Sequence, residues 1–286
     1  MIKFVKKKEM SLIRKYLFVL FTVLPFFSST ASVLSEFASK VCGMMSGDIV
    51  VTVPEGVTDI PDYAFADCSS LKEVTLPEGL KTIGDYAFLG CTGIEMIRLP
   101  DSVELLGEGA FRECSALRSL EVPQGVKKVP RYLCAWNENM VCVSLPEGLK
   151  DIGSHAFAYC AKLERVNIPQ GVEHIGSNVW SMCGSLKEIE IPSSVTELES
   201  YAFSDCSSLT KAVLPANNHL LGEWLFIGCG LLREIVCESP EPPTFDCGSP
   251  VFDESEAALY RECRLKILPG KEPLYSAAPV WRRFFE

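Results

Sequence analysis

The order of apolar and polar residues repeats every 23 residues over most of the chain, without insertion or deletion. An L-x-x-V-x-L segment is followed by proline, a V-x-x-I-G segment, an aromatic residue and a cysteine. The prolines stand at positions 54, 77, 100, 123, 146, 169, 192 and 215. The aromatic positions hold Phe65, Phe88, Phe111, Phe157, Trp180, Phe203 and Phe226. Such a fixed period is typical of a solenoid, in which each repeat is one coil stacked on the next.

The L-x-x-V-x-L segment predicts a short strand. Val74 and Leu76 alternate with Thr75, so the two apolar side chains point inward and the polar one points outward. Proline has no N–H to give to a ladder and therefore ends each strand up to Leu214. The pattern predicts nine parallel strands: Val51–Val53, Val74–Leu76, Ile97–Leu99, Leu120–Val122, Val143–Leu145, Val166–Ile168, Ile189–Ile191, Ala212–Leu214 and Ile235–Cys237.

The rest of each repeat predicts a way back to the next strand. Residues 76–79 suit a type I turn, and residues 80–84 form an extended segment with two more inward side chains. Residues 85–88 are expected to form a short helical turn that places the aromatic residue in the core. One coil cannot bury these residues alone, so stacked coils are expected to join them into continuous ladders.

The unit A-F-x-x-C-x-x-L-x-x-V-x-L-P-x-G-V-x-x-I-G, seen at 64–84 and again at 87–107, resembles the BspA-like, Treponema pallidum-type leucine-rich repeat. The resemblance covers residues 48–237 and extends more weakly to the tail at 265–270. It implies a repeat solenoid, a right-handed coil with a parallel β-sheet on the concave face and short helices or turns on the convex face. It also implies an exported or surface protein of a host-associated bacterium that binds partners and is not an enzyme.

One coil, at residues 123–145, departs from the pattern. The aromatic position holds Cys134, the cysteine position Asn137 and the glycine position Pro130, while Trp136 is out of register. Asparagine is expected to bond buried backbone here as cysteine does. We interpret the departure as drift with local repacking; the alternative is a local feature that a partner recognises.

The first 31 residues have the pattern of a secretory signal peptide. Lysines and arginines precede an apolar run over Tyr16–Phe27, and Ser28–Ser32 are small residues suited to cleavage. The alternative, a membrane anchor, is disfavoured because a span needs about 20 apolar residues. We therefore expect export to the cell surface or the medium, with periplasmic retention as the alternative, and no transmembrane helix in the mature chain. The predicted division is 1–31 signal peptide, 32–53 N-terminal start and first strand, 54–237 eight repeats, and 238–286 C-terminal cap.

Charge excludes one class of partner. The chain carries a net charge of −10, and its first 31 residues hold six cations and one anion, so the remainder carries −15. Nucleic-acid binding depends on clustered Lys and Arg that displace counterions from phosphate. The acidic chain is therefore not expected to bind nucleic acid.

The thirteen cysteines fall into two groups. Seven keep the 23-residue step and are expected to be buried, reduced thiols: Cys68, Cys91, Cys114, Cys160, Cys183, Cys206 and Cys229. The other six are better disulfide candidates because export permits oxidation: Cys42, Cys134, Cys142, Cys237, Cys247 and Cys263. A bridge among the last three would staple the tail.

The tail leaves the period at residues 239–243, a proline-rich connector. Residues 253–261 predict a short helix. The aromatic residues beyond it are expected to cover the open end of the stack: Tyr275, Trp281, Phe284 and Phe285.

The sequence carries no signature of catalysis. Its three histidines, His155, His174 and His219, belong to no catalytic motif, and no nucleophile elbow or phosphate-binding loop is present. Cysteine and histidine spacings do not match zinc sites. We predict no catalytic residue, no metal and no cofactor.

Outward strand residues predict the binding surface. They carry charges of both signs and lack an aromatic row, which favours a protein partner over a glycan, with Arg98 and Arg165 as hot spots. A merely solvated sheet face is the alternative. The predicted residues are Glu73, Thr75, Met96, Arg98, Ser119, Glu121, Arg165, Asn167, Glu188, Glu190 and Lys211.

Two functions remain open. The first is recognition or adhesion by a monomer that binds a protein on a host cell, in the matrix or in a bacterial envelope. The second is a structural or accessory role in an envelope assembly without a host ligand.

Overall fold

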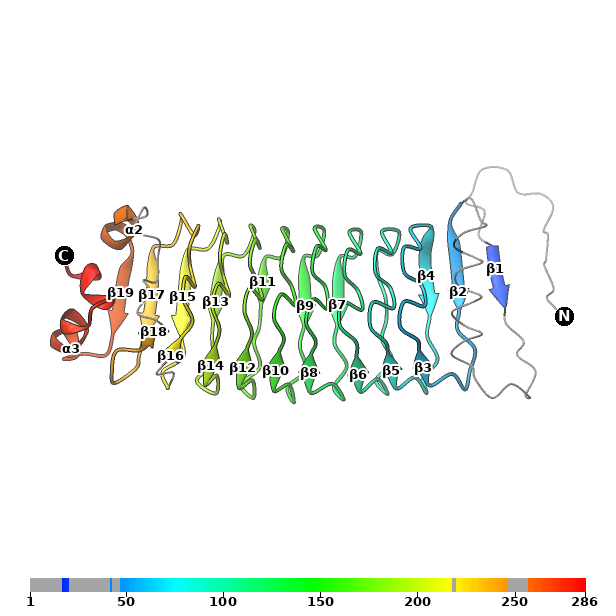
Figure 1. Ribbon diagram of the computed structural model, residues 1–286, viewed down its shortest axis with the longest axis horizontal. Helices are drawn as coiled ribbons and strands as arrows, with labels where there is room; N and C mark the ends of the chain where they lie inside the picture. The colour runs from blue at the N-terminus through cyan, green and yellow to red at the C-terminus, as the bar shows by residue number, and fades with distance from the viewer. Residues whose placement is uncertain (1–16, 21–41, 43–46, 218–219, 246–256) are drawn as a thin grey trace.

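The computed structural model describes residues 17–20, 42, 47–217, 220–245 and 257–286. The repeats form a parallel β-solenoid whose coils lie side by side along the long axis of the molecule (Figure 1). Two rows of strands run along the stack, one from each extended segment of the repeat. The predicted leucine-rich-repeat solenoid is confirmed.

The first strand row comes from the L-x-x-V-x-L segments. Its pairs are all parallel and fall into three sheets, ordered β1-β2-β4, β7-β9-β11 and β13-β15-β17-β19. The strands are β1 (Leu17–Leu20), β2 (Ile49–Thr52), β4 (Leu71–Thr75), β7 (Ser119–Glu121), β9 (Cys142–Ser144), β11 (Arg165–Val166), β13 (Glu188–Glu190), β15 (Lys211–Leu214), β17 (Glu234–Cys237) and β19 (Arg264–Ile267).

The strand predicted at Ile97–Leu99 does not form, and the row is interrupted there between β4 and β7. Ile97 and Leu99 are nevertheless buried, as the alternation requires. Apolar alternation encodes which side chains face the core, whereas a ladder needs backbone hydrogen bonds to both neighbours, which this pattern does not encode.

The second strand row comes from the V-x-x-I-G segments. These two-residue strands form sheets ordered β3-β5-β6 and β8-β10-β12-β14-β16-β18. They are β3 (Asp59–Ile60), β5 (Thr82–Ile83), β6 (Leu105–Leu106), β8 (Lys128–Val129), β10 (Asp151–Ile152), β12 (His174–Ile175), β14 (Glu197–Leu198), β16 (Leu220–Leu221) and β18 (Thr244–Phe245).

The predicted helical turn at residues 85–88 is wrong, and no helix occurs in the described repeats between residues 47 and 217. Every second amide of this segment bonds to the next coil, since Phe65 N donates to Ala87 O at 2.7 Å and Phe88 N donates to Ala110 O at 2.9 Å. The amides between them form local i to i−3 bonds, such as Leu89 N to Tyr86 O at 3.0 Å. Tyr86 has a positive φ of 54°. Amides committed to a neighbouring coil cannot also form the i to i−4 bonds of a helix.

Aromatic side chains stack through the core as predicted. Phe88 lies 5.1 Å from Phe65 and 5.4 Å from Phe111 between ring centroids, and all three are buried. The stack resumes after the divergent coil at Phe157. It is broken only where Cys134, also buried, takes the aromatic position.

The expectation for Asn137 is wrong. Its side chain is fully buried, and neither its Oδ1 nor its Nδ2 has a hydrogen-bond partner within the described part of the chain. The cysteine row behaves differently, because Cys114 Sγ donates to Phe88 O at 3.1 Å and Cys160 Sγ donates to Cys134 O at 3.2 Å. The divergent coil therefore carries an unsatisfied amide.

Six of the seven row cysteines are buried thiols that form no disulfide, as expected. Cys68 is the exception, because it forms a disulfide with Cys42 across a Cα–Cα distance of 5.1 Å. Cys42 stands 23 residues before Phe65 and so occupies the aromatic position of the preceding coil. Two cysteines thus meet at the N-terminal end of the row.

The C-terminal segment caps the stack with β19, α2 (Ala257–Glu262), α3 (Glu272–Ala277) and the 3₁₀ helix η3 (Trp281–Phe284). Trp281 is buried and donates from Nε1 to Pro243 O at 2.7 Å. Tyr275 is buried and donates to Ser239 O at 3.0 Å. Tyr275 and Trp281, two of the aromatic residues expected to cover the end of the stack, are thus buried, whereas Phe285 is exposed.

The expected tail bridge is not formed between Cys237 and Cys263, which are both free thiols. Cys237 Sγ instead lies 3.3 Å from the hydroxyl of Tyr275. Cys247 lies outside the described residues.

Most of the predicted signal peptide also lies outside the described residues. Of its apolar run, Leu17–Leu20 is described, and it pairs in parallel with β2 at the N-terminal edge of the first strand row. Among the described residues, no helix has the length and apolar character that a membrane crossing requires.

Candidate functional site

The eleven residues predicted to bind a partner lie together on the outward surface of the first strand row, which we call the first-row face. All are exposed or half-buried, while the residues that alternate with them, such as Leu120 and Ile189, are buried. The face comprises Glu73, Thr75, Met96, Arg98, Ser119, Glu121, Arg165, Asn167, Glu188, Glu190 and Lys211.

A groove of about 420 Å³ opens on this face at the interruption of the first strand row. Glu73 and Thr75 line it from β4, and Met96 and Arg98 line it from the coil without a strand. Met96 is 72% exposed, an unusual position for a large apolar side chain. The groove therefore combines an apolar side chain with charges of both signs.

The charges of the first-row face differ in how they are paired. Glu234 lies 3.7 Å from Lys211 and 2.7 Å from Lys266, and the hydrogen bond from Lys266 lowers the pKa of Glu234. Within the described residues, neither Arg98 nor Arg165 forms an ion pair. The two arginines predicted as hot spots are thus available to a partner.

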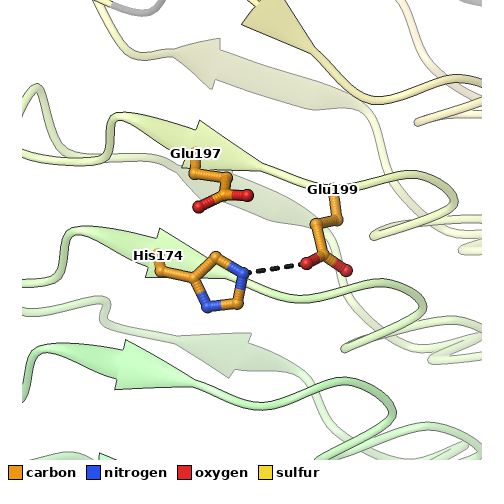
Figure 2. Close-up of side chains that lie close together, drawn as sticks. All are labelled: His174, Glu197 and Glu199. Carbon is orange, nitrogen blue, oxygen red and sulfur yellow. Dashed lines mark hydrogen bonds and ion pairs between the residues drawn. The ribbon is translucent and has the colours of Figure 1, made fainter. Parts of the chain in front are cut away.

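A second cluster lies in the second strand row, where β10, β12 and β14 run side by side. His174 Nε2 lies 2.9 Å from Glu199 Oε1, and His174 Nδ1 lies 3.2 Å from Asp151 Oδ2. Figure 2 shows the carboxylates of Glu197 and Glu199 turned toward the imidazole of His174. One ligand atom each from His174, Glu197 and Glu199 can be chosen so that all three lie within 4.8 Å of one another.

Electrostatics in this cluster favour charged side chains. Burial acts against the charged imidazole, but the hydrogen bond to Glu199 and the charges of Asp151, Glu197 and Glu199 outweigh it and raise the pKa of His174. Burial also opposes ionisation of Glu199, yet hydrogen bonds from Ser177 and His174 lower its pKa. The cluster therefore holds a carboxylate at Glu199 and a polarised imidazole at His174.

Glu199 occupies a position that is glycine in most coils. Residues 84, 107, 153, 176 and 222 are all glycine at this step of the repeat. A Cβ atom at Gly176 would lie 2.6 Å from Ser154 N, and one at Gly222 would lie 2.2 Å from Ser200 N. Neighbouring coils therefore approach too closely here for a side chain, and Glu199 is accommodated as an exception.

Sequence reasoning overlooked this cluster. The sequence assigns His174 to no motif and predicts no metal ligand, whereas the structure half-buries His174 between two carboxylates. The available signal was Glu199, because it breaks the glycine column of the repeat. His155 is half-buried too, and burial together with the charge of Arg131 lowers its pKa; His219 lies outside the described residues.

Three features define a leucine-rich-repeat solenoid. They are the geometry of the coils, the row of strands beside the prolines, and the buried ladders of leucine, aromatic and cysteine side chains. A model of the BspA type leucine-rich repeat region matches residues 49–137 and 127–242 in six copies. The chain belongs to this family. No curated protein matches the sequence.

Two solved structures with TM-scores above 0.5 show the same fold. A leucine-rich repeat protein from Bacteroides ovatus is 25% identical with a TM-score of 0.53, over 79% of this chain and 64% of that one. The pneumococcal vaccine antigen PcpA is 19% identical with a TM-score of 0.55, over 80% of this chain and 65% of that one. The T. pallidum leucine-rich repeat protein is 28% identical with a TM-score of 0.38, over 69% of this chain and 73% of that one. This chain spans less than two thirds of the length of the first two.

Proposed function

We propose that the protein is exported and binds a protein partner through its first-row face, as a monomer and without catalysis. The observation that carries this proposal is that Arg98 and Arg165 form no ion pair within the described part of the chain, and that the exposed Met96 lies beside Arg98. Arginine and large apolar side chains are typical of the residues that contribute most to protein interfaces.

The charge pattern of the face favours a protein over other partners. Glutamates accompany the arginines along the strands, so a uniformly charged polymer would meet repulsion at part of the face. The face has no row of exposed aromatic rings on which sugars would stack. A protein surface with its own mixture of charges is complementary to this arrangement.

Export is supported by chemistry in addition to the N-terminal pattern. The Cys42–Cys68 disulfide suits an oxidising compartment, because disulfides rarely persist in a reducing cytosol. The remaining row thiols are compatible with such a compartment because they are buried. Surface display or secretion would place the first-row face where a partner can reach it.

The proposal is tested by reversing two charges on the face. Arg98→Glu and Arg165→Glu together should weaken binding at least tenfold, since a hot-spot residue contributes about 2 kcal/mol or more. Lys127→Glu with Lys162→Glu makes the same change in net charge at exposed positions outside the face, and should leave binding unchanged. Binding is measured against host matrix proteins, mucins and envelope proteins of the producing cell, with folding checked by circular dichroism.

Each outcome decides between the candidate functions. Charge-sensitive binding to a host protein supports adhesion. Charge-sensitive binding only to the cell's own envelope supports an accessory role in an envelope assembly. Equal binding by both double variants rejects the first-row face as the interface.

A further inference from the structure

His174 of β12, Glu197 of β14 and Glu199, which follows β14, come close together in the second strand row (Figure 2). We propose that these three side chains form a binding site for a divalent transition-metal ion, with Zn²⁺ as the best match. The site is independent of the proposed partner binding, which uses the other strand row.

The spacing of the ligand atoms suits such an ion. Around a tetrahedral Zn²⁺ with bonds of about 2.0–2.1 Å, neighbouring ligand atoms are about 3.3 Å apart. His174 Nε2 and Glu199 Oε1 are already 2.9 Å apart, and Glu197 brings the third ligand atom within 4.8 Å. Glu197 is exposed, so rotation of its side chain closes the remaining distance. Water completes the coordination from the solvent side.

Asp151 positions the histidine for this role. Its Oδ2 lies 3.2 Å from His174 Nδ1, so with a metal bound Nδ1–H would donate a hydrogen bond to Asp151, and Nε2, having lost its own proton, would face the glutamates. A carboxylate behind a metal-binding histidine is the usual arrangement that fixes the ring and its tautomer. Asp151 is itself held by Lys128, whose Nζ lies 3.4 Å from Asp151 Oδ1.

Glu199 is held in place as a ligand. Its Oε2 accepts hydrogen bonds from the Ser177 backbone N–H at 2.8 Å and from the Ser177 hydroxyl at 2.6 Å, which leaves Oε1 toward His174. The position is glycine in five coils, where the neighbouring coil leaves little room for a Cβ atom, so the Glu199 side chain is present despite steric crowding. A carboxylate fixed by two donors and aimed at an imidazole is preorganised for a cation.

Local charge favours the ion as well. Asp151, Glu197 and Glu199 bring three carboxylates to the cluster. His174 contacts Asp151 and Glu199, and Lys128 contacts Asp151. A divalent cation would relieve this excess of negative charge. The imidazole ligand favours Zn²⁺ over Ca²⁺ or Mg²⁺, which prefer oxygen ligands alone.

The test measures Zn²⁺ binding to the untagged full-length chain by titration calorimetry. All proteins carry Cys142→Ser, because Cys142 is an exposed free thiol and thiolates also bind Zn²⁺. The parent should bind one Zn²⁺ at the cluster. Glu199→Gly removes a ligand yet restores the residue of the other coils, so it should keep the fold and lose at least tenfold in affinity. His174→Gln should do the same.

Two further variants separate ligation from general charge. Asp151→Asn should lower Zn²⁺ affinity about 10–100-fold and shift the visible absorption bands of bound Co²⁺, a change that loss of packing alone would not produce. Glu173→Gln removes a nearby carboxylate that is paired with Lys150, and its affinity should stay within about twofold of the parent.

The proposal is overturned by any of three results. The first is unchanged Zn²⁺ affinity in both Glu199→Gly and His174→Gln. The second is Ca²⁺ binding as tightly as Zn²⁺. The third is absence of saturable Zn²⁺ binding to a folded parent protein.

Discussion

Replacing Asn137 by cysteine is expected to stabilise the protein. Asn137 is fully buried in the divergent coil, and both polar atoms of its amide lack partners within the described residues. A buried unsatisfied polar group costs about 1–3 kcal/mol. A thiol at this position would instead donate to Phe111 O, because each row cysteine other than Cys68 bonds the carbonyl 26 residues before it.

The expected gain is about 2 kcal/mol in the free energy of unfolding, after allowance for incomplete repacking beside Cys134. For a chain of this size, that gain raises the melting temperature by about 3–4 °C. The assay is thermal and urea unfolding followed by circular dichroism under reducing conditions, so that the introduced thiol does not form a disulfide with a neighbouring row cysteine.

Asn139 offers a matched control two residues away. Its Nδ2 donates to Ser115 O at 2.7 Å, and its Oδ1 accepts from Lys162 Nζ at 2.7 Å, so its amide is satisfied. Asn139→Cys should therefore be neutral or destabilising by about 1 kcal/mol. An Asn137→Cys protein no more stable than the parent would refute the reasoning that the Asn137 amide is unsatisfied.

Three other predictions follow from the core and its thiols. Phe111→Ala should lower the free energy of unfolding by about 3–5 kcal/mol in urea titrations, because it truncates a buried ring of the aromatic stack; a loss below 1 kcal/mol would contradict that packing. Cys42→Ser should lower the free energy of unfolding by about 2–4 kcal/mol under oxidising conditions and by much less under reducing conditions. The control, Cys142→Ser, changes an exposed free thiol and should be neutral under both conditions. Alkylation at pH 8 followed by peptide mass spectrometry should label the exposed Cys142 first. Burial raises the pKa of Cys91 and Cys160 to about 12, so about one in 10⁴ of these thiols is ionised at pH 8. Rapid labelling of Cys91 in the folded protein would show that its coil opens.

Most of the fold was predictable because a 23-residue period encodes burial directly. Val74, Leu120 and Ile189 are buried at the predicted steps, and their alternating neighbours are exposed. Backbone pairing was less predictable, since Ile97–Leu99 obeys the same alternation without forming a strand. The convex turn was misjudged because every second amide in it bonds the adjacent coil, a partner that lies 22 residues away in sequence.

The candidate sites differ in the same way. The first-row face follows from alternation alone, because an outward step on a strand is outward in every coil. The second cluster depends on contacts between coils, which join Asp151, His174 and Glu199 across separations of 23 and 25 residues. Spacing rules for metal ligands describe short motifs and cannot detect ligands one coil apart. Cys42 is among the expected disulfide candidates, but its pairing with Cys68 was not expected, because the aromatic position of the repeat was not followed back to Cys42.

The central claim, that a partner binds the first-row face, is tested most directly by site-specific photo-cross-linking. A photoreactive amino acid at Met96 is compared with the same group at Leu105, which is 64% exposed in β6 of the second strand row. We predict that the partner cross-links to position 96 and that Arg165→Glu reduces the yield. Equal cross-linking from both positions, or cross-linking from position 105 alone, would contradict the claim.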